Sequence, residues 1–276
     1  MAQDSDIVVS KETNEYLDVI ELERKRKIDE EQRRWYEMKK RMLGDLIKQE
    51  YPSTSNEAFE SANEGLYYGA QLSKLRADNR ICSVPYDSSQ PVHMSFDIGL
   101  DDFTSIWAFQ INRGGQINVI NFYENWDEEI AHYADWINKQ RYHLGRIILP
   151  HDAAKRENSN KLSYADHLRA LLDNEGKIVI LDRGDCNPFE GIQAVRAMLG
   201  RCAFDEQKCS KGVKHLEAYR KLWDDRLGCY KNTPFHDEHS HAADAFRYLA
   251  IGLQALEVTT RGTVENDLKA VNRYFS

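Results

Sequence analysis

Apolar residues in the middle of the chain occur in short runs, and polar segments with turn residues separate these runs. Three runs rich in Val, Ile, Phe and Tyr cover residues 92–99, 104–112 and 116–125. Each is typical of a β-strand. The sequence NRGG at residues 112–115 is a turn signal, so we expect the second and third strands to form a hairpin.

Strand and helix patterns alternate after this hairpin. The short apolar runs at residues 146–152 and 177–182 predict two more strands, and the second of these is nearly all apolar. Such a composition is expected of a strand that is covered on both faces. Apolar residues at helical spacing predict helices over residues 128–143, 164–176, 188–200, 212–223 and 238–256.

The order of these elements predicts a single α/β domain. Three antiparallel strands lead into a parallel part, and helices cover both faces of the resulting mixed sheet. We therefore expect a mixed sheet of antiparallel hairpin strands plus parallel strands, flanked by helices on both faces.

The first part of the chain has a different pattern. Residues 15–50 are densely charged, with apolar residues at irregular helical intervals. They predict one or two helices packed along one stripe, a solvated arm or a connector to something outside this chain. The stripe consists of Tyr16, Ile20, Ile28, Trp35, Met38 and Met42.

A segment rich in small polar residues follows the arm and reads as a loop that leads into a short helix. We place the arm at residues 1–60 and the α/β domain at residues 61–260. Residues 261–276 are predicted to form a C-terminal tail.

Composition and charge narrow the class of protein. The chain has 276 residues and a net charge of −8, which does not by itself favour a nucleic-acid partner. A small basic groove can still lie on an acidic body, and a carboxylate cluster that binds cations also makes the total negative. No apolar run approaches the length of a membrane span, and the polar N-terminus is no signal peptide. We expect a soluble, intracellular protein that is not secreted and has no membrane partner.

The cysteines argue against a disulfide framework. There are five, widely spaced, as is typical of a protein in a reducing compartment. Cys202, Cys209 and His215 offer an alternative as zinc ligands, but no close C-x-x-C pair supports a zinc site.

Three aspartates lie at places where a carboxylate needs an explanation. Asp97 interrupts the apolar strand in HMSFDIGLDDFT, Asp152 closes the strand of IILPHD, and Asp244 lies near the start of the last helix in SHAADAF. Alanines around Asp244 would let this helix approach a neighbouring backbone closely. If the strands that carry Asp97 and Asp152 are parallel neighbours, both acids lie at the carboxyl ends of these strands, where ligand sites gather.

Three converging carboxylates would repel one another, and a divalent cation relieves this repulsion. Oxygen ligands without a thiol favour Mg²⁺ or Mn²⁺, and two such ions can support phosphodiester hydrolysis. His241, one helical turn before Asp244, could orient it or shuttle a proton, and Asp102 could be an outer ligand. Each acid also has an ordinary interpretation: Asp152 as a cap, Asp244 as a helix residue, Asp102 as a turn residue.

Four segments in the same order resemble the nuclease portion of the large terminase subunit of tailed bacteriophages, the DNA-packaging motor. They are QEYPSTSNEAFESANEGLYY, FDIGLDDFTSIW, ILPHDA and HSHAADAFRYLA, and the resemblance covers roughly residues 30–256. Each motif is short, but four in the right order are quite specific.

The resemblance implies a ribonuclease H-like fold and metal-dependent endonuclease activity on concatemeric double-stranded DNA. Asp97, Asp152 and Asp244 match the metal-binding aspartates of the family, and Asp102 matches an acid that often follows the first motif. The family also implies the terminase small subunit and the capsid portal as partners. The expected place of action is the cytoplasm of a bacterial host, at the procapsid.

The departure from the family is at the N-terminus. Large terminases carry an ATPase domain before the nuclease, with a G-x-x-x-x-G-K-[ST] loop, and this sequence has no such loop. The arm therefore resembles the linker end of an ATPase domain of the full-length protein. We expect this chain to cut DNA, with little sequence preference, without hydrolysing ATP.

Two other functions remain compatible with the sequence. One is a resolvase-like or transposase-like nuclease of the same fold, and the other is a module that docks the packaging motor onto its partners. Phosphate contacts near the site would come from basic residues, for which the candidates are Lys155, Arg156, Lys161, Lys231 and Arg247.

Overall fold

The computed structural model describes residues 7–44, 47–55, 57, 63–99, 102–155, 162–172 and 177–253. The chain divides into two compact units, Met1–Glu64 and Gly65–Ser276. The sequence places this boundary after residue 60, and the predicted tail over residues 261–276 lies outside the described residues. Within the described ranges, no helix is both long enough and apolar enough to cross a membrane.

The first unit contains the helices α1 (Lys11–Arg24), α2 (Glu30–Leu43) and the short α3 (Ile47–Glu50). Lys25, in the left-handed region, ends α1, and Asp29 begins α2 with a reciprocal capping box. The two helices share one apolar cluster, against which Tyr16 and Ile28 of the predicted stripe pack, but the stripe is not buried throughout. Trp35 and Met42 are 42% and 71% exposed.

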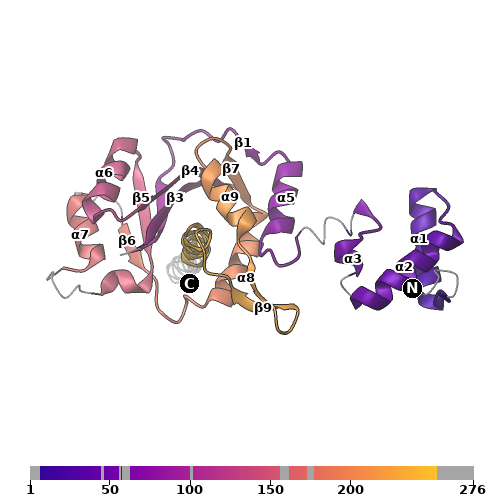
Figure 1. Ribbon diagram of the computed structural model, residues 1–276. Helices are drawn as coiled ribbons and strands as arrows, with labels where there is room; N and C mark the ends of the chain where they lie inside the picture. The colour runs from indigo at the N-terminus through magenta and orange to yellow at the C-terminus, as the bar shows by residue number, and fades with distance from the viewer. Residues whose placement is uncertain are drawn as a thin grey trace, which may run out of the picture. The chain divides into compact units, whose positions relative to one another are not determined.

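The second unit is built on a sheet in the order β1-β7-β4-β3-β2-β5-β6 (Figure 1). The pairs β2–β3 and β3–β4 are antiparallel. The pairs β2–β5, β5–β6, β4–β7 and β7–β1 are parallel. The strands are β1 (Ile81–Cys82), β2 (Val92–Asp97), β3 (Phe103–Ile111), β4 (Ile117–Trp126), β5 (Leu144–Leu149), β6 (Lys177–Ile180) and β7 (Cys202–Asp205).

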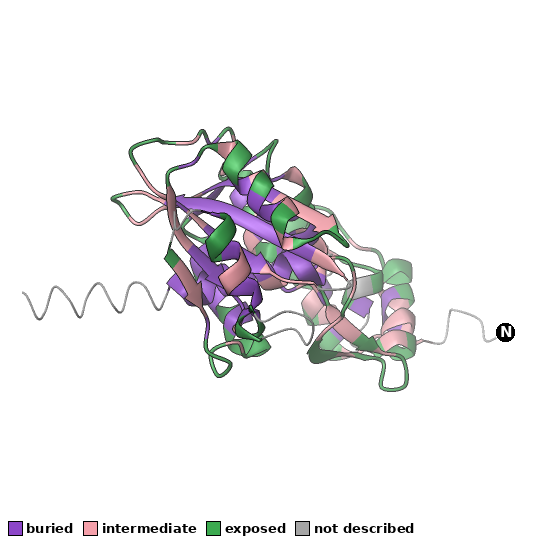
Figure 2. Ribbon diagram, turned by 90° about the vertical axis from the view of Figure 1, so that its left-hand side faces the viewer, coloured by how far each residue is buried: buried purple, intermediate pink, exposed green. Residues whose placement is uncertain are grey.

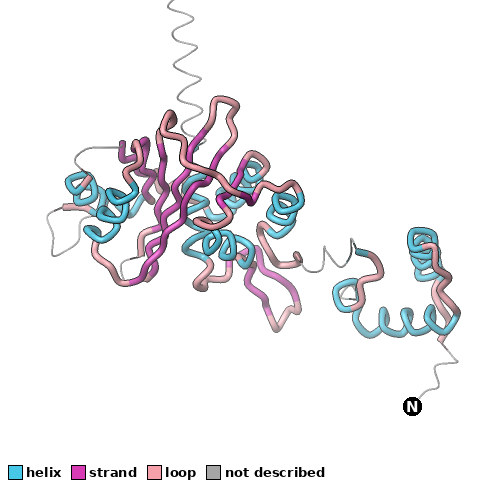
Figure 3. The backbone as a smooth tube through the Cα atoms, turned by 90° about the horizontal axis from the view of Figure 1, so that it is seen from above, coloured by secondary structure: helices cyan, strands magenta, loops and turns pink. Residues whose placement is uncertain are grey.

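Helices lie on both sides of this sheet, as the view from above shows (Figure 3). One side carries α6 and α7, and the other carries α5, α8, α9 and the helical residues 240–253. The predicted ribonuclease H-like mixed sheet is thus confirmed. The bounds of the labelled helices are α5 (Gly69–Ala77), α6 (Ile130–Gln140), α7 (Tyr164–Leu171), α8 (Pro188–Leu199) and α9 (Ser210–Ala218).

Alternation along the strands creates a core on each face of the sheet, and the buried strands are visible inside the unit in Figure 2. On β3, Trp107 and Phe109 belong to the core beneath α8, α9 and residues 240–253. Ile106, which precedes Trp107, and Ala108, which lies between Trp107 and Phe109, belong to the core beneath α6 and α7. A sheet that is apolar on both faces explains why these strands read as continuous apolar runs.

One helix prediction is too long. The helix predicted over residues 212–223 ends at Ala218, and the residues after Arg220 form β8 (Lys221–Asp224), which pairs with β9 (Cys229–Pro234) in a separate two-stranded sheet. The short strands β1 and β7 were not predicted.

Candidate metal centre

Asp97 and Asp152 lie at the same edge of the sheet. Asp97 is the last residue of β2, and Asp152 lies in the 3₁₀ turn η3 (His151–Ala154), which follows β5. Strands β2 and β5 pair in parallel, with Ser95 opposite Ile148. Their carboxyl ends therefore meet, as the sequence pattern predicts, and Asp152 is among the charges that raise the pKa of Asp97.

Asp244 reaches this edge from the helix over residues 240–253. Ala242, Ala243 and Ala245 are fully buried, so the helix backbone packs closely against the sheet. The indole Nε1 of Trp107 on β3 donates a hydrogen bond of 2.8 Å to the carbonyl oxygen of Ala242. This bond joins the helix to the centre of the sheet at the residue that follows His241, the histidine partner of Asp97.

His241 lies between two carboxylates. Its Nδ1 donates to Oδ2 of Asp97 at 3.2 Å, and its Nε2 lies 3.0 Å from Oδ2 of Asp102. The hydrogen bond to Asp97 raises the pKa of the His241 imidazole, because both ring nitrogens face negative charge. The ring thus links the end of β2 to the connection between β2 and β3.

The buried carboxylates have a high affinity for positive charge. Burial raises the pKa of Asp97, and it raises the pKa of Asp244 to about 7 although Arg247 Nη1 lies 2.8 Å from Asp244 Oδ1. The nearby charge of Asp97 also raises the pKa of Asp244. Asp244 Oδ1 is buried and accepts no hydrogen bond from the described residues, despite the nearby guanidinium.

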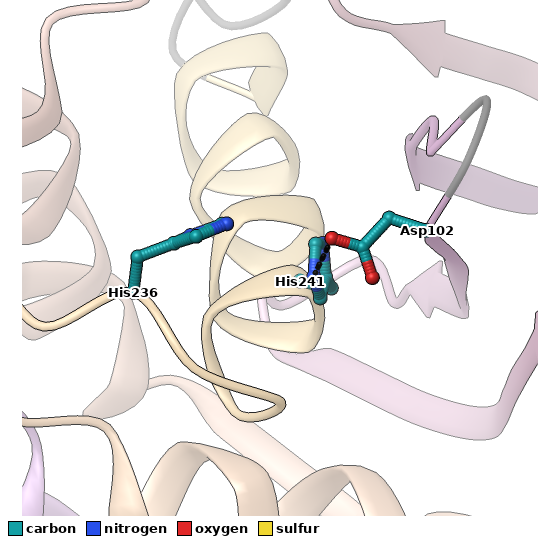
Figure 4. A group of neighbouring side chains, drawn as sticks. All are labelled: Asp102, His236 and His241. Carbon is teal, nitrogen blue, oxygen red and sulfur yellow. Dashed lines mark ion pairs between the residues drawn. The ribbon is translucent and has the colours of Figure 1, made fainter.

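This donor set fits a hard divalent cation. The three aspartates supply oxygen atoms only, and a cation would compensate the charge of Asp97 and Asp244, whose pKa values burial raises. In the described part of the chain, the potential metal ligands whose atoms all lie within 4.8 Å of one another are Asp102, His236 and His241 (Figure 4). The three aspartates do not form such a group. An arrangement in which the aspartates surround two ions, as the sequence predicts, does not require one such group.

The structure corrects one candidate for DNA contact and leaves others open. Arg247 is 5% exposed, its stem packs against Gly191, and its charge is paired with Asp244, so it is no surface phosphate ligand. Lys231 pairs with Asp224 at 2.8 Å, whereas Lys155 is exposed beside Asp152. Arg156 and Lys161 lie outside the described residues.

The alternative zinc ligands do not come together. The Sγ atoms of Cys202 and Cys209 donate to the carbonyl oxygens of Met198 and Val119, and His215 lies between Glu124 and His239.

Sequence reasoning missed His236. It precedes the last helix by one turn of chain, and nothing in the local pattern marks it. The turn over residues 236–239 brings its ring within 5.4 Å of the His241 ring, centroid to centroid.

No protein-family model matches the sequence, and no curated protein matches it. Solved structures do. The large terminase from the thermophilic bacteriophage D6E, in complex with ATP-gamma-S, has a TM-score of 0.50 at 17% identity, over 68% of this chain and 45% of that chain. The P22 large terminase nuclease domain gives 0.46 at 14%, over 64% and 89%. The nuclease domain of the bacteriophage SPP1 large terminase, with bound Mn, gives 0.39 at 18%, over 58% and 82%.

The chain is therefore similar in fold to large terminases, and the resemblance predicted from the sequence is confirmed at the level of fold. The chain spans about half the length of the D6E protein.

Proposed function

We propose that the chain is the metal-dependent endonuclease part of a viral DNA-packaging terminase. The observation that supports this proposal is the position of Asp97, Asp152 and Asp244 near one edge of a ribonuclease H-like sheet, where the charge of Asp152 acts on Asp97 and that of Asp97 on Asp244. Asp97 and Asp152 end neighbouring parallel strands, and Asp244 lies on a helix that packs against the same sheet. The motifs around these acids support the terminase assignment.

Asp97, Asp152 and Asp244 would hold Mg²⁺ or Mn²⁺, with two ions expected. Two ions bound there would activate a water molecule and stabilise the leaving oxygen of a phosphodiester. The chain's own residues orient the ligands. His241 donates from Nδ1 to one oxygen of Asp97, and Arg247 pairs with one oxygen of Asp244. Such partners fix the direction of a carboxylate before it binds an ion.

The substrate is concatemeric double-stranded DNA, cut with little sequence preference. Exposed basic residues such as Lys155 would contact phosphates, which position DNA without reading its sequence. The terminase small subunit, the capsid portal and an ATPase domain of the full-length protein are the proposed partners. Packaging would place the protein in the cytoplasm of the bacterial host, at the procapsid.

Cleavage of supercoiled plasmid in Mn²⁺ tests the proposal with the variants Asp97→Asn, Asp152→Asn and Asp244→Asn. Asp135→Asn is the matched control, because Asp135 is exposed on α6, on the other side of the sheet. Each site variant should lose cleavage and the control should retain it. Wild-type rates in all three site variants would refute the assignment. A preference for four-way junctions over linear duplex would instead favour a resolvase-like enzyme, and a protein that is inert but binds a partner would favour a docking module.

A further inference from the structure

Positive side chains gather at one edge of the main sheet, the amino edge, at which every strand except β3 begins. Asp97 and Asp152 lie at the opposite edge, where β2 and β5 end. The net charge of the chain is −8, so a basic edge does not follow from its composition. The cations of the amino edge lie just before a strand, in the first half of a strand or in the β3–β4 turn, and they are Arg80, Arg113, Arg146, Lys177 and Arg201.

Two of these cations face each other across neighbouring strands. Arg146 of β5 is the register partner of Lys177 of β6, so both side chains lie on the same face of the sheet. Like charges in this position repel each other. Among the described residues, no carboxylate forms an ion pair with either side chain. An anion bound between them removes the repulsion, and a phosphate group is an anion that both side chains bind well.

Two further cations border a hollow between β1, β7 and the β3–β4 turn. This hollow has a volume of about 340 Å³ and is lined by Arg80, Gly114, Gly115, Gln116 and Arg201. Nη1 of Arg80 donates to the carbonyl oxygen of Gly200 at 2.6 Å, which holds this guanidinium next to the peptide bond that leads into Arg201. A Cβ atom at Gly115 would lie 3.9 Å from Nη1 of Arg201, so the hollow is open at the turn. Guanidinium groups beside such an opening suit a phosphate, which arginine binds through parallel hydrogen bonds.

The spacing of the two groups of cations suits a duplex that lies along the edge. Six strand intervals separate β1 from β6, or about 29 Å at roughly 4.8 Å per interval. Successive base pairs of a duplex are about 3.4 Å apart, so the edge spans roughly eight of them. A small anion fills one group of cations only, whereas a duplex presents phosphates to both.

We propose that the amino edge of the sheet binds double-stranded DNA through its phosphates, at a site separate from the metal centre. The inference rests on the proposed function for the identity of the polyanion, and on the five cations for its place. Strand β5 has six residues and is about 20 Å long at roughly 3.3 Å per residue, so DNA on this edge lies away from Asp152. DNA held here is bound without being cut, and its sequence is not read because only phosphates are contacted.

The experiment measures binding of a fluorescein-labelled linear duplex by anisotropy, in EDTA so that no cation bridges the DNA to the three aspartates. Arg113→Glu and Lys177→Glu are the test variants, because both side chains are exposed and they lie on different strands of the edge. Lys214→Glu is the matched control. It makes the same change of charge at an exposed lysine on α9, which has no ion pair among the described residues.

Each test variant should weaken duplex binding at least tenfold at low salt, and the control should bind as the wild type does. Each test variant should also lower the slope of log Kd against log salt concentration by about 1, because one phosphate contact contributes about 0.9 to that slope. Thermal unfolding verifies that each variant is folded.

The absence of duplex binding by the wild-type chain, or equal weakening by Lys214→Glu, would overturn the proposal. Displacement of the duplex by an equal charge concentration of poly-glutamate would also overturn it, in favour of an acidic protein as the partner. Asp97→Asn separates this proposal from the nuclease assignment, since it should lose cleavage in Mn²⁺ and keep duplex binding in EDTA. Loss of binding in Asp97→Asn would place the DNA at the metal centre and would overturn the separate site.

Discussion

Asp97 and Glu124 occupy one row across the sheet, on either side of Ser105 in β3. Asp97 pairs with Ser105, and Ser105 pairs with Glu124, so the two carboxylates lie on the same face, roughly 10 Å apart by the spacing of strands. Both are largely buried, and each contacts a histidine, His241 or His215. Their surroundings differ in the amount of positive charge.

The charge of Glu124 has two positive partners, both at one oxygen. Its Oε1 accepts from Lys211 Nζ at 2.7 Å and from His215 Nε2 at 3.1 Å. Burial alone would raise the pKa of Glu124, but these hydrogen bonds outweigh it and the pKa is lowered. Burial raises the pKa of Asp97, the charge of Asp152 raises it further, and its histidine is shared with Asp102. Of two carboxylates in the same row, Glu124 thus belongs to a structural ion pair, whereas Asp97 is a candidate metal ligand. The neighbouring charges make this difference.

The largest expected effect is the loss of DNA cleavage when Asp97 is replaced. Asp97→Asn should reduce plasmid cleavage by a factor on the order of 100 or more, because the variant loses a charged ligand for the ions. The free energy of unfolding should stay the same or rise without metal, since an incompletely compensated charge is removed. Plasmid cleavage and urea unfolding on the same preparation measure both. A loss of stability with cleavage intact would show that Asp97, like Glu124, has a structural role.

Glu124→Gln should have the opposite effect: it should lower stability and leave cleavage unchanged. It removes the charge that Lys211 and His215 contact, so the free energy of unfolding should fall by about 2 kcal/mol. Cleavage should persist at close to the wild-type rate. Glu217→Gln on α9 is the control, because its pair with Arg76 is more exposed and should contribute under about 1 kcal/mol. Equal losses in both variants would show that the buried pair has no special role.

Gly191→Ala tests how Arg247 supports Asp244. A methyl group at Gly191 would lie 2.2 Å from Cγ of Arg247, so the guanidinium stem must shift away from the aspartate. We expect a loss of about 1 to 2 kcal/mol in the free energy of unfolding, as for other overpacked sites, together with slower cleavage. Gly184→Ala, which meets nothing within 4 Å, is the matched control and should change neither.

The smallest effect concerns His93, a histidine with no acid partner in the described residues. It accepts a hydrogen bond from the Arg146 backbone N–H at 3.0 Å, and burial lowers its pKa to about 4. Its stabilising contribution is complete above pH 6.5 and is lost as pH falls towards 4, because the unfolded chain takes up the proton first. His93→Gln should flatten stability between pH 6.5 and 4. Histidine NMR titration should show His93 remaining neutral after His241 is charged.

The sequence predicted the sheet well where periodic runs were long. The hairpin of β3 and β4 and the parallel neighbours β2 and β5 follow from strand-length runs, turn residues and chain order. Strands β1 and β7 are two and four residues long, too short for any period to distinguish them from loop or helix. The helix that ends at Ala218 was extended into β8 because Leu222 and Trp223 continue an apolar spacing that the backbone does not follow.

The sequence pattern marks the acids of the proposed centre but not the side chains that contact them. Asp97 stands out because a charge interrupts an apolar run, and Ala242 and Ala243 mark a helix that packs closely. Residue type misled for Arg247, since arginine is usually exposed and its burial depends on Gly191, which is distant in sequence. The contact of His236 with His241 depends on one turn of chain before the last helix, which no periodicity encodes.

The hydrogen bond from Trp107 to Ala242 also bears on when the proposed centre forms during synthesis of the chain. The helix that carries His241 and Asp244 follows every described strand of the sheet in the chain. A ribosome working at about 5–20 residues per second releases Asp97 and Asp152 several seconds before Asp244. Until the last helix docks against Trp107, the proposed centre lacks its third acid. A nascent chain therefore carries an unfinished centre, and the proposed nuclease activity would begin only when the last helix is in place.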